Sequence, residues 1–199
     1  MINVGVLGST KGTDLQAILD SIASGKLDAQ ISIVISNIRD SFILERADKH
    51  GVATKFIDHR EKTRKEFDLL ITQELIKHKV ELILLIGFMR ILSSEFCKMW
   101  EGKILNVHPS LLPKYAGGMD TNVHEEVLNN KDLETGCTIH LVTDKIDSGP
   151  ILIQKKCLVD PTDTVRTLKS KVQNLEALAL LEAITLFNGN GQKKHPKHN

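Results

Sequence analysis

The fold is decided by residues 2–22, which read INVGVLGSTKGTDLQAILDSI. The run from Ile2 to Leu7 is compact and apolar and closes at Gly8, which is typical of a buried parallel strand. After a loop of Gly, Ser and Thr, apolar residues recur at the spacing of one helix face, and they are Leu15, Ile18, Leu19 and Ile22. A strand that leads into a helix in this way predicts the start of a βαβ unit.

The same alternation continues through the first hundred residues. The pattern predicts strands at Ile31–Ser36, Thr54–Ile57, Leu82–Ile86 and Lys103–Val107, and helices at Phe42–His50 and around Phe67–Leu75. We therefore expect an α/β, Rossmann-like fold: an open, mostly parallel, twisted sheet with helices on both faces. Ligands of such sheets bind beyond the carboxyl ends of the strands, so the loops after Leu7, Ile86 and Val107 are candidate binding loops.

The second half of the chain has a different pattern. A helix is predicted at Asn122–Asn129, two strands at Thr138–Val142 and Ile151–Val159, and a long helix at Asp163–Phe187. Two successive strands without a helix between them indicate a hairpin-like extension of the sheet. We expect a single domain over residues 1–188 and a disordered polar tail over residues 189–199.

Composition narrows the class of protein. The 26 basic and 25 acidic side chains nearly cancel, so no net field favours a nucleic acid or an anionic membrane as partner. The 3 cysteines form no Cys-x-x-Cys pair, so neither a metal site nor a redox pair is expected. The amino terminus lacks the basic region of a signal peptide, and no apolar run approaches the roughly 20 residues of a membrane span. The sequence predicts a cytoplasmic protein, monomeric or homodimeric.

One candidate site follows the Lys103–Val107 strand. It reads Asn106-Val107-His108-Pro109-Ser110-Leu111-Leu112-Pro113. Asn106 and His108 are two residues apart and therefore point to the same side of a strand end. An amide donor and an imidazole that face one spot can stabilise an oxyanion. The alternative is an ordinary Asn and His in a turn marked by prolines.

A second candidate site is the turn Thr143-Asp144-Lys145-Ile146-Asp147-Ser148-Gly149-Pro150. Its two acids are common turn formers. A carboxylate also raises the pKa of a nearby histidine, because it favours the charged ring. The residues alone do not decide whether Asp144 or Asp147 would have this effect.

A third candidate site is the loop Gly8-Ser9-Thr10-Lys11-Gly12-Thr13-Asp14, between a strand and a helix. Backbone amides of such a loop, together with the helix N-terminus, can hold a phosphate. The loop matches neither the dinucleotide fingerprint nor the Walker sequence. Asp14 could equally be a plain N-cap residue.

The first two segments together resemble the folate-dependent formyltransferases. The resemblance rests on Asn106 to Pro113 paired with Asp147-Ser148-Gly149-Pro150, and it extends from about Asn3 to Phe187. Three shorter matches, Gly87–Leu92, Lys114-Tyr115 and Val172-Gln173 with Glu176, point to the members that formylate glycinamide ribonucleotide in purine synthesis. The resemblance implies transfer of a formyl group from 10-formyltetrahydrofolate to that amine, without a metal.

The resemblance also implies a role for each matching residue. Asn106 and His108 would be catalytic, and Asp147 would raise the pKa of His108. The folate would contact Arg64, Met89, Arg90, Ile91, Leu92, Asn106, Thr143 and Asp144. Lys11, Gly12, Thr13 and Asp14 would hold the phosphate of the ribonucleotide, and Glu176 its ribose hydroxyls.

Two departures from the family pattern lie near the amine substrate. Asp14 places a carboxylate where the family usually has a neutral asparagine, which Lys11 could offset. The segment 116–121 reads AGGMDT rather than the commoner Pro-Gly-Leu-His. The alternatives are therefore a formyltransferase for another small amine, such as an amino-sugar nucleotide, and a non-catalytic nucleotide-binding module on the same fold.

Overall fold

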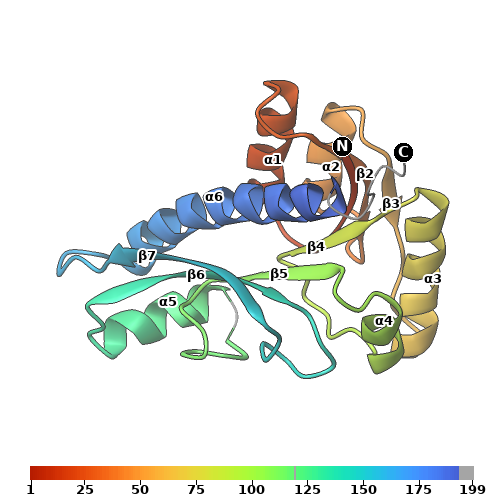
Figure 1. The fold of residues 1–199 in the computed structure, drawn as a ribbon. Helices are drawn as coiled ribbons and strands as arrows, with labels where there is room; N and C mark the ends of the chain where they lie inside the picture. The colour runs from red at the N-terminus through yellow and green to blue at the C-terminus, as the bar shows by residue number, and fades with distance from the viewer. Residues whose placement is uncertain (119, 193–199) are drawn as a thin grey trace.

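The structure is a computed structural model that describes residues 1–118 and 120–192. Its centre is a 7-stranded sheet in the order β3-β2-β1-β4-β5-β6-β7 (Figure 1). The strands are β1 Ile2–Gly8, β2 Ala29–Ser36, β3 Thr54–Phe56, β4 Leu82–Ile86, β5 Ile104–His108, β6 Glu134–Leu141 and β7 Ile151–Leu158. Strands β1 to β5 are parallel, whereas β6 runs antiparallel to β5 and β7 antiparallel to β6.

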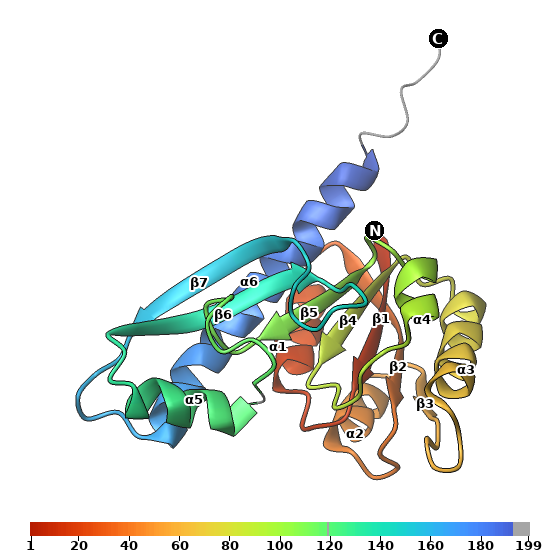
Figure 2. The same ribbon diagram turned by 90° about the horizontal axis from the view of Figure 1, so that it is seen from below.

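Helices cover both faces of the sheet (Figures 1 and 2). They are α1 Thr13–Ala23, α2 Phe42–Lys49, α3 Arg64–Lys77, α4 Ser94–Met99, α5 Asp120–Asn129 and α6 Val165–Gln192. One apolar core joins the sheet to α1, α2 and α6 through buried side chains such as Ile18, Ile43 and Leu180. A second core joins the other face to α3 and α4 through Phe67, Ile71 and Phe96. The predicted fold class is confirmed.

The predicted hairpin-like extension is the β6–β7 pair. The long helix α6 packs across this pair and against α1. The helix continues to Gln192, so the expected start of a disordered tail at Gly189 lies inside it. Asn188 explains part of this continuation, because its Nδ2 donates to the backbone oxygen and the carboxylate of Asp28. The remaining tail, residues 193–199, lies outside the described residues.

Two features of the fold differ from the sequence prediction. Helix α4 was not predicted, because its 6 residues are too few to show a helical period. Its N-cap is Ser93, whose hydroxyl accepts a hydrogen bond from the backbone N–H of Phe96. Strand β6 begins at Glu134, four residues before the predicted start at Thr138.

The carboxyl ends of β1, β4 and β5 lie at one edge of the sheet (Figure 2). Two loops are bonded there: the N–H of Ser9 donates to the carbonyl of Gly87 at 3.1 Å, and the N–H of Met89 donates to Ser9 Oγ at 3.0 Å. Gly87 has a φ of 57°, and a Cβ on it would lie 2.3 Å from Thr10 Oγ1. Only glycine permits this approach of the two loops.

Candidate active site

Asn106 and His108 lie at the end of β5 and face the same side, as their spacing predicts. In the antiparallel pairing of β5 with β6, Asn106 is opposite His140. Asn106 Nδ2 lies 3.1 Å from His140 Nε2. The amide of Asn106 carries two N–H groups, so one remains to face a substrate oxygen.

Asp147, not Asp144, completes this group. Its carboxylate lies 3.3 Å from His108 Nδ1 and 3.5 Å from His140 Nε2. It also accepts a 2.8 Å hydrogen bond from the backbone N–H of Gly117. Asp144 is exposed. The choice that residue types alone left open is therefore decided by geometry.

Both ring nitrogens of His108 face acceptors. Nε2 donates to the carbonyl oxygen of Tyr115 at 3.0 Å, and Nδ1 faces the carboxylate of Asp147. Only the doubly protonated ring can donate to both. The contacts of the ring therefore favour the imidazolium.

Burial acts on the pKa of His108 in the opposite direction to Asp147. The side chain is only 3% exposed, and this burial lowers the pKa of His108 below its usual value although Asp147 raises it. Burial alone would raise the pKa of Asp147, but the hydrogen bond from the backbone N–H of Gly117 and the nearby rings of His140 and His108 lower it overall. Asp147 is therefore ionised at neutral pH, and the pKa of His108 lies below its usual value.

The residues expected at the folate lie on the same edge of the sheet. Met89 and Ile91 are exposed by 46% and 49%, whereas Leu92 is buried in the core under α3 and α4. Its side chain packs there because the loop turns inward to start α4, where the N–H of Ser93 donates to Asp68. The expectation that Leu92 lines an open folate site does not hold for its side chain.

Two arginines flank the same loop. The guanidinium of Arg90 lies 4.8 Å from the centre of the Phe67 ring. Arg64 begins α3, and both arginines lie near the buried carboxylate of Asp68. Thr143 is exposed, and its carbonyl oxygen accepts a hydrogen bond from Cys97 on α4. The structure thus gathers the 87–92 and 143–147 segments around the end of β5.

The candidate phosphate loop has the backbone such a site needs. Gly12 precedes α1 in the left-handed conformation, with φ 64°, and a Cβ there would lie 2.4 Å from Ile43. Lys11 and Thr13 flank it, and the Lys11 side chain is exposed. Gly12 is the N-cap residue of α1, so Asp14 is not a plain N-cap, and no capping side chain bonds the first amides of the helix.

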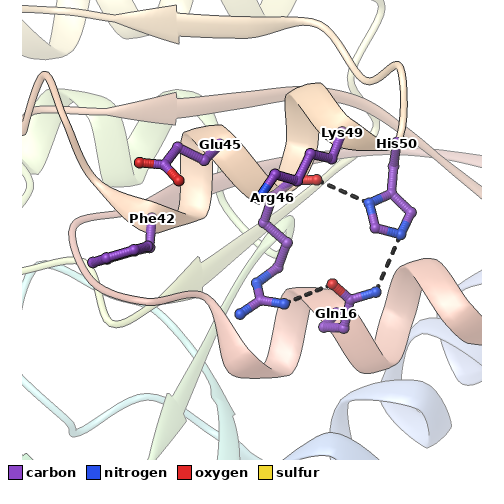
Figure 3. A pocket seen from close by; sticks show the side chains of 6 residues that line it. All are labelled: Gln16, Phe42, Glu45, Arg46, Lys49 and His50. Atoms are coloured by element: carbon purple, nitrogen blue, oxygen red, sulfur yellow. Dashed lines mark hydrogen bonds between the residues drawn. The ribbon is translucent and has the colours of Figure 1, made fainter.

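Arg46 of α2 connects this loop to α1 through two hydrogen bonds. Its Nε donates to the carbonyl of Lys11 at 3.3 Å, and its Nη1 donates to Gln16 Oε1 at 2.6 Å. Figure 3 shows Arg46 reaching from α2 across a pocket to Gln16 on α1, with His50 and Lys49 beside it. Lys11 directly precedes Gly12, so the hydrogen bond from Arg46 to the Lys11 carbonyl fixes the path of the backbone into the turn at Gly12.

Asp14 is buried, which changes its expected charge. Its side chain is 7% exposed, and burial raises its pKa from 3.8 to about 7. At neutral pH a large fraction of Asp14 is a neutral carboxylic acid, and that form resembles the asparagine of the family pattern. Glu176 of α6 is 8% exposed, and the charges of Glu176 and Asp14 both raise the pKa of Cys137.

Sequence reasoning missed three residues of this region: His140, Tyr115 and Arg46. His140 sits two residues from Thr138 on β6, but its partner is set by the register of β5 with β6, which periodicity does not give. Tyr115 acts through its carbonyl, and Arg46 through a contact between elements. His140 and Arg46 lie in no local sequence pattern. Tyr115 belongs to the Lys114-Tyr115 match, but the contact of its carbonyl with His108 cannot be read from the sequence.

Within residues 1–118 and 120–192, no group of three or more His, Cys, Asp or Glu is placed to ligate a metal ion. In the same residues no helix is long and apolar enough to cross a membrane. An amide, a buried imidazole and a carboxylate at the carboxyl ends of the strands of an open α/β sheet are the groups expected in an enzyme that stabilises an oxyanion.

Comparison with known proteins agrees with this class. The formyl transferase family profile matches residues 2–184. The chain is 37% identical to the phosphoribosylglycinamide formyltransferase of Escherichia coli over 98% of this chain and 91% of that protein. The glycinamide ribonucleotide transformylase 1 of Symbiobacterium toebii superposes with a TM-score of 0.91 at 36% identity, over 96% of this chain and 89% of that one.

Other relatives are longer. The trifunctional purine biosynthetic protein adenosine-3 of Gallus gallus is 42% identical over 93% of this chain, but the match covers 18% of that protein. The chain thus spans less than a fifth of the trifunctional relatives that it matches. It belongs to the formyl transferase family, and the resemblance seen in its motifs is confirmed.

Proposed function

We propose that this chain transfers the formyl group of 10-formyltetrahydrofolate to the amine of glycinamide ribonucleotide, a step of purine synthesis. Family membership supports a folate-derived formyl donor and small-molecule substrates. The observation that carries the proposal is the group of Asn106, His108 and Asp147 at the carboxyl edge of the sheet, with His108 3.3 Å from Asp147.

The reaction is a direct transfer. The amine nitrogen attacks the formyl carbon, the new C–N bond forms, and the bond from that carbon to N10 of the folate breaks. The amine loses one proton and N10 gains one, so protons balance. In the tetrahedral transition state negative charge gathers on the formyl oxygen, where the free N–H of Asn106 donates and His108 supplies positive charge.

The lowered pKa of His108 fits this mechanism, because the ring needs its proton only when the oxyanion forms. Negative charge beside a buried imidazole raises its proton affinity. Asp147 and the Tyr115 carbonyl already offer acceptors to both ring nitrogens. The charged ring is thus favoured in the transition state over the ground state, and that difference is what accelerates a reaction.

The acceptor side rests on the loop at Lys11 to Asp14 and on Glu176. The open amides at the start of α1 and the exposed ammonium of Lys11 suit a phosphate. Asp14 does not repel that phosphate in its neutral form. Glu176 of α6, whose charge acts on Cys137 as that of Asp14 does, is the proposed partner of the ribose hydroxyls.

The test is ultraviolet difference absorbance of 10-formyltetrahydrofolate, with glycinamide ribonucleotide, with an amino-sugar nucleotide, and with neither. Turnover that requires the ribonucleotide supports the proposal. Turnover only with the sugar nucleotide assigns another acceptor, and turnover without any amine identifies a hydrolase. No turnover at all contradicts the enzyme and favours a binding module. The single domain over residues 1–188, the cytoplasmic location and the monomeric or homodimeric state stay predictions.

A further inference from the structure

A short loop contacts both members of the His108–Asp147 pair through its backbone. The carbonyl of Tyr115 accepts from His108 Nε2 at 3.0 Å and from the N–H of Gly118 at 3.1 Å. Two residues on, the N–H of Gly117 donates to Asp147 Oδ2 at 2.8 Å. The position of residues 115–118 therefore sets the hydrogen bonds of the imidazole and of the carboxylate together.

Tyr115 adopts a backbone conformation that is unfavourable for its side chain. Its φ is 61°, in the left-handed region that a bulky residue rarely enters. Such a conformation persists only where the surroundings hold it. Here that conformation directs the Tyr115 carbonyl to His108.

The hydroxyl of Tyr115 is held at the far end of the side chain. It donates to Asp132 Oδ2 at 2.8 Å and accepts from Asn130 Nδ2 at 2.8 Å. The other oxygen of Asp132 accepts from Lys114 Nζ at 2.6 Å. Asp132 is only 12% exposed, so its bond to the hydroxyl is shielded from water.

These two partners are themselves fixed by helix α5. The N–H of Asn130 donates to the carbonyl of Glu126 at 2.9 Å, and the N–H of Asp132 donates to that of Val127 at 3.1 Å. The segment that holds the tyrosine hydroxyl is thus a continuation of a packed helix, whose Val127 is fully buried.

We propose that Asn130, Tyr115 and Asp132 form a positioning anchor, which ties helix α5 to the backbone that orients His108 and Asp147. None of the three touches the reacting atoms through its side chain. They act by fixing the Tyr115 carbonyl on Nε2 of His108 and the Gly117 amide on Asp147. The effect on catalysis rests on the proposed function, whereas the effect on the His108 ring does not.

Tyr115→Phe tests the anchor, because it removes the hydroxyl and keeps the ring. The charged or titratable groups that face His108 are Asp147 and His140, and both stay in place. Lys114→Met is the matched control, since it removes the ion pair to Asp132 and leaves both bonds of the hydroxyl. Nitrogen NMR of the histidine rings reports which nitrogens of His108 carry protons, and steady-state kinetics separate kcat from KM.

We expect the His108 ring signals of Tyr115→Phe to shift, and kcat to fall by about tenfold with both KM values within about twofold. Lys114→Met should match the wild type in both readouts. Unchanged ring signals in a folded Tyr115→Phe overturn the anchor, whether or not kcat falls. Should Tyr115→Phe not fold, Asn130→Ala removes one bond to the hydroxyl and must shift the same signals. If the chain transfers no formyl group, the ring signals still decide the anchor.

Discussion

Asp147→Asn removes the charge beside His108 and keeps the shape of the side chain. The carboxylate lies 3.3 Å from Nδ1 of a ring that is 3% exposed. Two charges about 4 Å apart interact by about 4 kcal/mol at the effective dielectric of a protein surface. The neutral amide of the variant avoids the cost of burying a carboxylate, which offsets part of the lost charge interaction and leaves a net loss of about 3 kcal/mol. Since 1.4 kcal/mol is a factor of ten, we expect kcat to fall by about a hundredfold.

The assay is the initial rate of formyl transfer, with circular dichroism to show that the variant is folded. Substrate KM values should change far less than kcat, because the oxyanion exists only in the transition state. Asp144→Asn is the matched control: Asp144 is exposed in the same turn, so we expect a mild change, mainly in folate KM. If Asp144→Asn is inactive and Asp147→Asn is active, the carboxylate that acts on His108 is Asp144 and the assignment to Asp147 is wrong. Near-normal kcat in both variants would refute the carboxylate–histidine reasoning.

Two further predictions concern the phosphate loop. Burial raises the pKa of Asp14 from 3.8 to about 7, so the folded chain holds this proton longer than the unfolded chain does, and the resulting stability is lost as pH rises from about 4 to 7. In the wild type the free energy of unfolding, measured with urea, should therefore fall by on the order of 2–4 kcal/mol between pH 4 and pH 8, and in Asp14→Asn this fall should be absent. The same pH dependence in both proteins would show that Asp14 is ionised throughout. Lys11→Ala should raise the ribonucleotide KM by about tenfold and leave the folate KM unchanged. Lys49→Ala, in the pocket between α1 and α2, should change neither KM. Equal effects of the two variants would indicate a long-range attraction of the phosphate by positive charge and not a contact with Lys11.

Much of the fold can be predicted from the sequence, because the local spacing of apolar residues indicates which segments form strands and which form helices. The apolar runs Ile2–Leu7 and Leu82–Ile86 give β1 and β4, and the helix predicted at Phe42–His50 is α2, Phe42–Lys49. Helix α4 escaped because one and a half turns show no period. The end of α6 escaped because Asn188 is held by Asp28, far away in the chain.

The site was predictable only as far as its motifs extend. The spacing of Asn106 and His108 places them on one side of a strand, and the structure agrees. The register of β5 with β6 places His140 in the site, and the charge of Asp14 depends on its burial in the folded chain, which no local pattern gives. Asp147 raises the pKa of His108 as predicted, but burial lowers it more, and burial cannot be read from two residues and a turn.

The central claim is a direct transfer by Asn106, His108 and Asp147, and the fate of the formyl carbon tests it most directly. A single turnover with 10-formyltetrahydrofolate labelled at the formyl carbon, followed by carbon NMR, resolves each species that carries the label. We predict that the label passes from the folate to the amine of glycinamide ribonucleotide with no protein-bound formyl species on the way. Label on a side chain of the enzyme, or label released as formate in the presence of the ribonucleotide, would contradict the account.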